Sequence, residues 1–248
     1  MYENLKKKYG QNFLIDRNIL KKISGLINKK NLKIIEIGPG NGALTEFILK
    51  FEPKKIKLIE IDKDLIVELN SKFSDSNIEI IHFDILKYKF DENFDLIISN
   101  LPYNISSQII SKICLSKILP DKLILMFQKE FADRLLDKKL NSINSLVNCF
   151  YDINKKFHVS RNCFRPIPKI DSTVLLFSKK KKLLLNYDEK ENFIFFKRNV
   201  FSQKRKTLKK VLKNFTIQDS KVNLSLRVED LSLESLILLF RDINYENS

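Results

Sequence analysis

Short apolar runs alternate with stretches of helical spacing through the first half of the chain. Most positions of each run are apolar, which is typical of a strand buried in a sheet. The runs cover residues 32–37, 55–61, 78–83, 94–100 and 122–127. Between the first three runs, residues 43–51 and 65–73 place apolar side chains at helical spacing. The alternation predicts right-handed βαβ units and therefore an α/β fold on a mostly parallel sheet.

The pattern changes after the fifth run. Residues 129–136 predict one more helix, since their apolar positions recur at helical spacing. Two further apolar runs, at 155–159 and 172–177, predict an antiparallel pair that closes the sheet.

From Asp188 onward the spacing is helical, with one apolar face. That face consists of Phe193, Phe196, Val200, Leu208, Val211 and Leu212. A last helix is predicted over 232–240. We therefore expect an α/β domain over residues 1–182 and a small all-helical domain over 183–248.

A cluster of glycines follows the first predicted strand. The chain has only five glycines, and three of them, Gly38, Gly40 and Gly42, lie close together. A backbone that must adopt positive φ, or lie against a ligand, requires glycine in this way. A strand, a glycine turn and a helix in this order predict a nucleotide-like ligand, because N–H groups at such a turn favour anionic groups. By itself the motif fits a dinucleotide and S-adenosylmethionine equally well.

Acidic side chains follow the second and third strands. Glu60 stands about 20 residues after the glycine turn, where a carboxylate can accept both hydroxyls of a ribose. Asp62 is the alternative, but its place before residues 65–73 fits a helix N-cap better. Asp84 can accept from the exocyclic amine of adenine, or it can simply form a turn. Ligands of parallel sheets bind beyond the carboxyl ends of the strands, so we expect the glycines, Glu60, Asp84 and Asn100 to meet in one crevice.

The segment Asn100–Asn104 has the sequence NLPYN and closes the fourth strand. Pro102 interrupts the strand, so the segment is predicted to form a rigid turn at the crevice. The Asn100 side chain and the Leu101 main-chain carbonyl offer two acceptors, and Tyr103 offers an aromatic face. A planar aminopurine fits these three groups. Two acceptors on the amino hydrogens localise the nitrogen lone pair towards a methyl donor, so positioning and electrostatics carry the catalysis.

Positive charge is concentrated in two zones of the chain. The formal net charge is +15, of which residues 1–30 contribute +6 and residues 179–213 contribute +10. Segregation of this kind indicates a polyanionic partner, nucleic acid before anionic membrane, while a solvated lysine-rich face is the plain alternative. The residues predicted to contact RNA are Lys204, Arg205, Lys206, Lys209 and Lys210.

Composition excludes several other classes of protein. No apolar run approaches the ~20 residues of a membrane span, and the first residues lack the apolar core of a secretory signal. Cys114, Cys149 and Cys163 are widely spaced, which fits neither a disulfide framework nor a zinc site. We therefore expect a cytoplasmic protein with buried, reduced thiols and no metal.

Several motifs taken together resemble one enzyme family. In chain order they are KKYGQNFLID, the glycine loop, LIEID, NLPYNIS, FQKEFADRLL, FRPIPKIDSTV, FSQKRKTLKK and LRVEDLSLE. This order resembles that of the rRNA adenine N6-dimethyltransferases, and the likeness covers Lys7 to Phe240. It implies a Rossmann-like S-adenosylmethionine-dependent methyltransferase domain, with a mostly parallel seven-stranded sheet, and a small C-terminal helical domain.

The resemblance also implies roles for individual residues. The implied cofactor-binding residues are Asn12, Leu14, Gly38, Gly40, Glu60, Asp84 and Asn100. The implied catalytic residues are Asn100, Leu101, Pro102, Tyr103 and Phe164. Phe164 would stack on a flipped target base opposite Tyr103. Pro166 and Pro168 predict that Phe164 lies in a loop and not in the core.

Four hypotheses about function are open at this point. The resemblance favours a monomer that dimethylates the N6 amino groups of two adjacent adenosines in the 3′-terminal hairpin loop of 16S rRNA, on the immature 30S subunit. A 23S rRNA adenine methyltransferase of the macrolide-resistance type is the nearest rival, although such enzymes typically have Ile where this chain has Leu101. A non-catalytic assembly factor would share the fold and charge, but the intact NLPY turn favours activity. An NAD-dependent dehydrogenase would leave NLPY and both basic zones unexplained.

Overall fold

The computed structural model describes residues 11–203, 205–215, 217 and 221–243. The described residues form two compact units. The first unit consists of the described residues up to Asp133 together with Asp152–Lys179, and the second of Arg134–Tyr151 together with those from Lys180 onward. The stretch Arg134–Tyr151 thus joins the second unit, although it lies well before the boundary that the sequence pattern predicts after residue 182.

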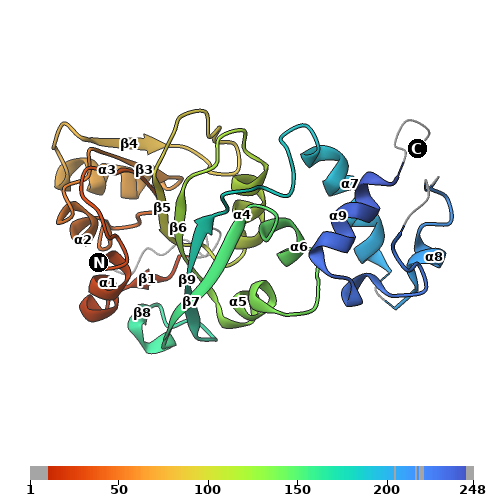
Figure 1. Cartoon of the computed structure of the whole chain (residues 1–248). Helices are drawn as coiled ribbons and strands as arrows, with labels where there is room; N and C mark the ends of the chain where they lie inside the picture. The colour runs from red at the N-terminus through yellow and green to blue at the C-terminus, as the bar shows by residue number, and fades with distance from the viewer. Residues whose placement is uncertain (1–10, 204, 216, 218–220, 244–248) are drawn as a thin grey trace. The chain divides into compact units, whose positions relative to one another are not determined.

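The first unit is built on a seven-stranded sheet (Figure 1). Its strands are β2 (Lys33–Ile37), β3 (Lys55–Glu60), β4 (Ile78–His82), β5 (Leu96–Asn100), β6 (Lys122–Gln128), β7 (Tyr151–Val159) and β9 (Ser172–Lys179). They lie in the order β4-β3-β2-β5-β6-β9-β7, and the first five of that order are parallel to one another. All seven predicted strands are confirmed. β9 runs antiparallel to β6 and lies beside β7.

Burial along the sheet follows the position of each strand. The central strands β2, β3, β5 and β6 are buried at almost every position, as expected where helices cover both faces. The edge strand β7 instead exposes Lys155 and Lys156. Charged side chains on an edge strand oppose pairing with a second sheet, so they keep this edge from associating.

In the described residues up to Leu136, five helices accompany the sheet. They are α1 (Arg17–Ser24), α2 (Thr45–Leu49), α3 (Lys63–Lys72), α4 (Ser106–Leu115) and α5 (Lys129–Leu136). The prediction that Asp62 caps a helix is confirmed, because its carboxylate accepts from the N–H of Asp64 at the start of α3. Helix α2 is shorter than predicted, since Ala43 and Leu44 still belong to the turn after β2. Helices α1 and α4 were not predicted from the sequence pattern.

A short ribbon joins two segments that lie far apart in the chain. Strand β1 (Phe13–Leu14) pairs antiparallel with β8 (Phe164–Arg165), which follows the 3₁₀ turn η2 (Arg161–Cys163). Figure 1 shows β1 and β8 near the lower edge of the sheet. Two-residue strands carry no readable periodicity, so the sequence pattern did not reveal this pairing.

The described part of the second unit is mainly helical. Its elements are α6 (Asn144–Val147), α7 (Lys190–Ser202), α8 (Leu208–Val211), η3 (Val228–Asp230) and α9 (Leu233–Arg241). Phe240 of α9 packs against two rings of α7, with centroids 5.2 Å from Phe193 and 5.6 Å from Phe196. The apolar face predicted for this region is buried except at Val211, which is half-buried.

The three cysteines are thiols that are not joined by disulfides. Cys114 and Cys149 are buried as predicted, but the prediction is wrong for Cys163, which is only half-buried. It lies in η2, where its sulfur stands 3.7 Å from a carboxylate oxygen of Asp16. Among the residues that the structure covers, no group of three or more His, Cys, Asp or Glu side chains is arranged to hold a metal ion. Each helix in the same residues is too short or too polar to cross a bilayer.

Candidate active site

A cavity of the first unit opens at the carboxyl ends of the parallel strands. Its walls come from the segment around β1, the glycine loop after β2, and the residues that follow β3, β4 and β5. The predicted site residues that line it are Asn12, Leu14, Gly38, Gly40, Glu60, Asp84, Asn100, Leu101, Pro102 and Tyr103. The prediction that these strand ends meet in one crevice is confirmed. The chemical role of each residue stays a prediction.

The loop after β2 has the positive φ angles that the sequence predicts. They are 62° at Gly38, 59° at Gly40 and 77° at Gly42. A methyl group placed on Gly40 would lie 2.7 Å from Cε1 of Phe13 in β1. Only glycine fits there, because the Phe13 ring packs directly against the loop.

Glu60, at the end of β3, is buried and accepts three main-chain hydrogen bonds. One carboxylate oxygen accepts from the N–H groups of Ile61 and Asp62, each over 2.9 Å, and the other accepts from Gly40 over 3.2 Å. Burial raises the pKa of Glu60 above its usual value, against the lowering effect of these N–H groups. The hydrogen bond from Gly40 therefore fixes the position of the glycine loop relative to the carboxylate that is predicted to bind ribose.

Glu36 is a second buried carboxyl group in this cavity, and it was not among the predicted site residues. It lies on β2, lines the cavity and accepts a hydrogen bond from Thr45 Oγ1 over 2.7 Å. Burial raises the pKa of Glu36 to about 8, against the lowering effect of the Thr45 hydrogen bond, and the nearby Glu60 carboxylate adds to the rise. A cation bound in the cavity would favour ionisation of both groups, so the pair favours a positively charged ligand.

Asp84 fits both hypotheses made for it. Its carboxylate accepts from the N–H of Leu86 over 2.9 Å, which is the turn-forming contact, and the residue also lines the cavity. Asp62, the alternative to Glu60, does not line the cavity. Its carboxylate caps α3 and accepts from Gln11 Nε2 over 2.8 Å.

The NLPY turn forms one wall of the cavity. Asn100 Nδ2 donates to the main-chain carbonyl of Asn12 over 3.0 Å, which fixes the plane of the amide. The other end of that amide, Oδ1, is the acceptor that the predicted chemistry uses. The Tyr103 hydroxyl shares a hydrogen bond of 2.8 Å with Ser172 Oγ at the start of β9, and burial raises the pKa of Tyr103. Leu101 is buried and also lines the cavity.

Phe164 does not occupy the position predicted for it. It lies in β8 with 0% of its surface exposed, within the hydrophobic core that also contains Leu14 and Val174, and it does not line the cavity. The prediction of a loop position outside the core is wrong, because β8 pairs with β1 and the ring packs inward. Stacking of Phe164 on a target base stays a prediction, and it requires the ring to leave the core.

The described residues among those predicted to contact RNA lie in the second unit, around α8. Arg205, Lys206, Lys209 and Lys210 are exposed. Lys204 lies outside the described residues, as do residues 1–10 of the first basic zone. The exposed side chains are free of the core, so their charge is available to a partner in solution.

Comparison with known proteins identifies the family. The model of the family described as ribosomal RNA adenine dimethylase matches residues 2–244, which is nearly the whole chain. The chain belongs to the ribosomal RNA adenine dimethylase family.

Named relatives in this family are similar over most of their length. The protein named ribosomal RNA small subunit methyltransferase A in Pelagibacter ubique is 44% identical over 220 residues, which are 85% of this chain and 83% of that protein. Its namesake in Mycoplasmopsis pulmonis is 40% identical over 256 residues, which are 96% and 98% of the two chains.

Solved structures agree with the fold of this ribosomal RNA adenine dimethylase family member. A dimethyladenosine transferase from Plasmodium falciparum matches with a TM-score of 0.75 and 29% identity, over 92% of this chain and 96% of its own. The 23S rRNA methyltransferase ErmE matches with a TM-score of 0.72 over 93% and 99%. Its identity is 23%, so that likeness supports the fold alone.

Proposed function

We propose that this chain dimethylates the N6 amino groups of two adjacent adenosines in the 3′-terminal hairpin loop of 16S rRNA, with S-adenosylmethionine as the methyl donor, while the small ribosomal subunit is assembled. The observation that carries the proposal is the position of the NLPY turn. Its Asn100 amide, fixed by the Asn12 carbonyl, stands in the wall of the same cavity as the glycine loop and Glu60. The family and the names of the relatives support the same substrate class.

The cavity fits S-adenosylmethionine better than a dinucleotide. Glu60 is placed to accept the ribose hydroxyls, and Asp84 to accept from the adenine amine. Glu36 adds a second buried carboxyl group, and a bound cation, unlike the pyrophosphate of NAD, would favour the ionised form of both carboxyl groups. When bound, S-adenosylmethionine supplies a methyl group activated by its positive sulfur.

The NLPY turn is placed to activate the amino group of an adenine. Asn100 Oδ1 and the Leu101 carbonyl accept its two hydrogens, which localises the nitrogen lone pair towards the methyl group. The Asn12 contact holds the amide in this orientation before the substrate binds, so no reorganisation is required during the reaction. The hydrogen bond between Tyr103 and Ser172 orients the tyrosine ring, whose face is the stacking surface for the base.

The other hypotheses explain fewer observations. The 23S rRNA alternative rests on a likeness of fold, whereas the relatives at 40–44% identity are named for the small subunit. A non-catalytic assembly factor would not need the fixed Asn100 amide in the cavity wall. A dehydrogenase would leave that turn without a purpose. We also propose that the protein acts as a monomer in the cytoplasm, where its thiols stay reduced.

The decisive experiment maps the modified bases. Primer extension on small-subunit rRNA is expected to stop at two adjacent adenosines near the 3′ end when cells contain this protein, because N6,N6-dimethyladenine cannot form a Watson–Crick pair. Purified protein is expected to restore the stops on rRNA particles from cells that lack it, with S-adenosylmethionine as the donor and not with NAD. Read-through at both adenosines in the presence of protein and donor would refute the proposal.

We propose that the exposed basic residues around α8 bind RNA phosphates. Lys209→Ala with Lys210→Ala is expected to weaken RNA binding and to flatten the dependence of log K on log salt by roughly 0.7–0.9 for each phosphate interaction removed, because fewer counterions are released. Binding measured by fluorescence anisotropy across a salt series tests this. The matched control is Lys50→Ala with Lys54→Ala, which removes the same charge from exposed positions between α2 and β3 of the first unit and is expected to keep the slope. An unchanged slope in the α8 variant would place the RNA-binding surface elsewhere.

A further inference from the structure

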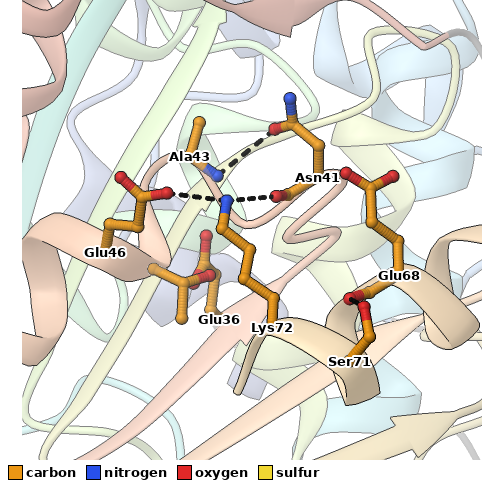
Figure 2. A network of polar contacts seen from close by, with 8 residues as sticks. Glu36, Asn41, Ala43, Glu46, Glu68, Ser71 and Lys72 are labelled. Carbon is orange, nitrogen blue, oxygen red and sulfur yellow. Dashed lines mark hydrogen bonds and ion pairs between the residues drawn. The ribbon is translucent and has the colours of Figure 1, made fainter. Parts of the chain in front are cut away.

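The end of α3 contacts the glycine loop through a lysine. Lys72 Nζ donates a hydrogen bond to the main-chain carbonyl of Asn41 over 3.1 Å. The same Nζ pairs with the Glu46 carboxylate over 2.6 Å. Figure 2 shows Lys72 between these two partners. Because Asn41 belongs to the glycine loop and Glu46 to α2, Lys72 ties the loop to both helices.

The residue after Lys72 packs on the same loop. A methyl group placed on Gly42, whose φ is 77°, would lie 2.5 Å from Cε2 of Phe73. The Phe73 ring therefore occupies the space into which any side chain at position 42 would point. The loop rests on the end of α3 through one polar and one apolar contact.

The peptide unit between Asn41 and Gly42 is held at both ends. Its carbonyl accepts from Lys72, and its N–H, which belongs to Gly42, donates to the carbonyl of Pro39 over 2.9 Å. The Asn41 side chain also accepts from the N–H of Ala43 over 3.2 Å (Figure 2). Rotation of this peptide plane would break a hydrogen bond, so Lys72 selects one conformation of the loop.

The conformation of the loop affects the cavity directly. Gly40 and Asn41 line the cavity, whereas Lys72 and Glu46 do not. Gly40 also donates to Glu60, so a shift of the loop would disturb the carboxylate that is proposed to bind ribose. Lys72 thus contacts a residue of the cavity wall without lining the cavity itself, and it can affect a ligand there only through the loop.

We propose that Lys72 is a positioning residue for S-adenosylmethionine, which fixes the Asn41–Gly42 peptide while Glu46 holds its ammonium group in place. The inference rests on the proposed function, since it concerns the cofactor of that reaction. The Lys72 and Glu46 side chains are 35% and 37% exposed, and ion pairs in such positions contribute little to stability. The effect of Lys72 therefore falls on ligand binding and not on folding.

The test compares two ligands in wild-type protein and variants by isothermal titration. Lys72→Met is expected to weaken S-adenosylmethionine and its uncharged-sulfur product, S-adenosylhomocysteine, equally and by roughly 5- to 20-fold, in the range of one partly exposed charged hydrogen bond. The KM for the cofactor is expected to rise by the same factor, with kcat at saturation unchanged. Lys72→Arg keeps a donor and is expected to restore affinity. Lys54→Met, with the same loss of charge far from the cavity, is expected to bind like wild type.

The pair of ligands separates positioning from simple electrostatics. If Lys72 acted only through its charge, its removal would tighten binding of the cationic S-adenosylmethionine and leave the product unchanged, and this result would overturn the proposal. Wild-type affinity for both ligands in folded Lys72→Met would overturn it as well. Should Lys72→Met fail to fold, Glu46→Gln serves as the second variant and is expected to weaken both ligands. Failure of the wild-type protein to bind S-adenosylmethionine would instead contradict the proposed function.

Discussion

Replacing Asn100 by alanine is expected to slow methyl transfer about 10²–10³-fold, the usual loss for an acceptor or donor placed where charge develops in the transition state. The side chain is part of the cavity wall, and its Nδ2 donates to the Asn12 carbonyl. Alanine removes both the acceptor and the contact that orients it. RNA affinity is expected to change little, because the proposed phosphate contacts lie around α8. Single-turnover methyl transfer to 30S-like particles measures the effect.

The control for this variant is Asn104→Ala. Asn104 is the second amide of the same NLPYN segment, but it is exposed and does not line the cavity. It is expected to transfer methyl groups at the wild-type rate. Far-UV circular dichroism establishes that both variants fold. A folded Asn100→Ala protein that works at the wild-type rate would show that the amide does not activate the amino group.

Replacing Phe164 by alanine is expected to destabilise the protein by about 3–5 kcal/mol, the usual loss for a large aromatic side chain truncated in a core. The ring is fully buried, and Phe164 pairs with Leu14 across the β1–β8 ribbon. Its loss would leave a cavity beneath the segment that carries Asn12 and Leu14 into the active site. The fall in melting temperature, read by circular dichroism at a fixed heating rate, measures the effect.

Two further variants sharpen this measurement. Ile167→Ala removes an apolar side chain from the same FRPIP segment, but Ile167 is 54% exposed, so little change in melting temperature is expected. Phe164→Leu keeps most of the apolar volume and loses the ring face, so it separates packing from base stacking. A Phe164→Ala protein as stable as wild type would show that the ring is not part of the core in solution. Impaired capture of the target base by a stable Phe164→Leu protein would support the stacking role.

The strands and the place where they meet could be predicted from the sequence for a local reason. A parallel strand buried on both faces is mostly apolar, so runs such as 32–37 and 94–100 can be recognised without a structure. Polar residues just after such runs must lie at the same edge of the sheet. That rule brought Glu60, Asp84 and Asn100 together correctly, and the spacing of glycines in a glycine-poor chain marked the loop with positive φ.

Other features depend on contacts between distant residues, which leave no local pattern. Two prolines near Phe164 indicate a loop. In the structure, however, β8 pairs with β1, which lies about 150 residues earlier in the chain, and the Phe164 ring is buried in the core. Glu36 reads as one acidic residue in an apolar strand, and only the fold shows it in the same cavity as Glu60 with its pKa raised by burial.

The sequence by itself determined the fold class, the family and the residues that converge on the cavity, because these follow from periodicity and from motifs in a fixed order. Tertiary structure alone decided how those residues are held. The Asn100 amide is oriented by a carbonyl at residue 12, and the glycine loop by Lys72 at the end of α3. Such contacts join residues whose separation along the chain carries no signal, so their chemistry emerges only when the sheet brings them within hydrogen-bonding distance.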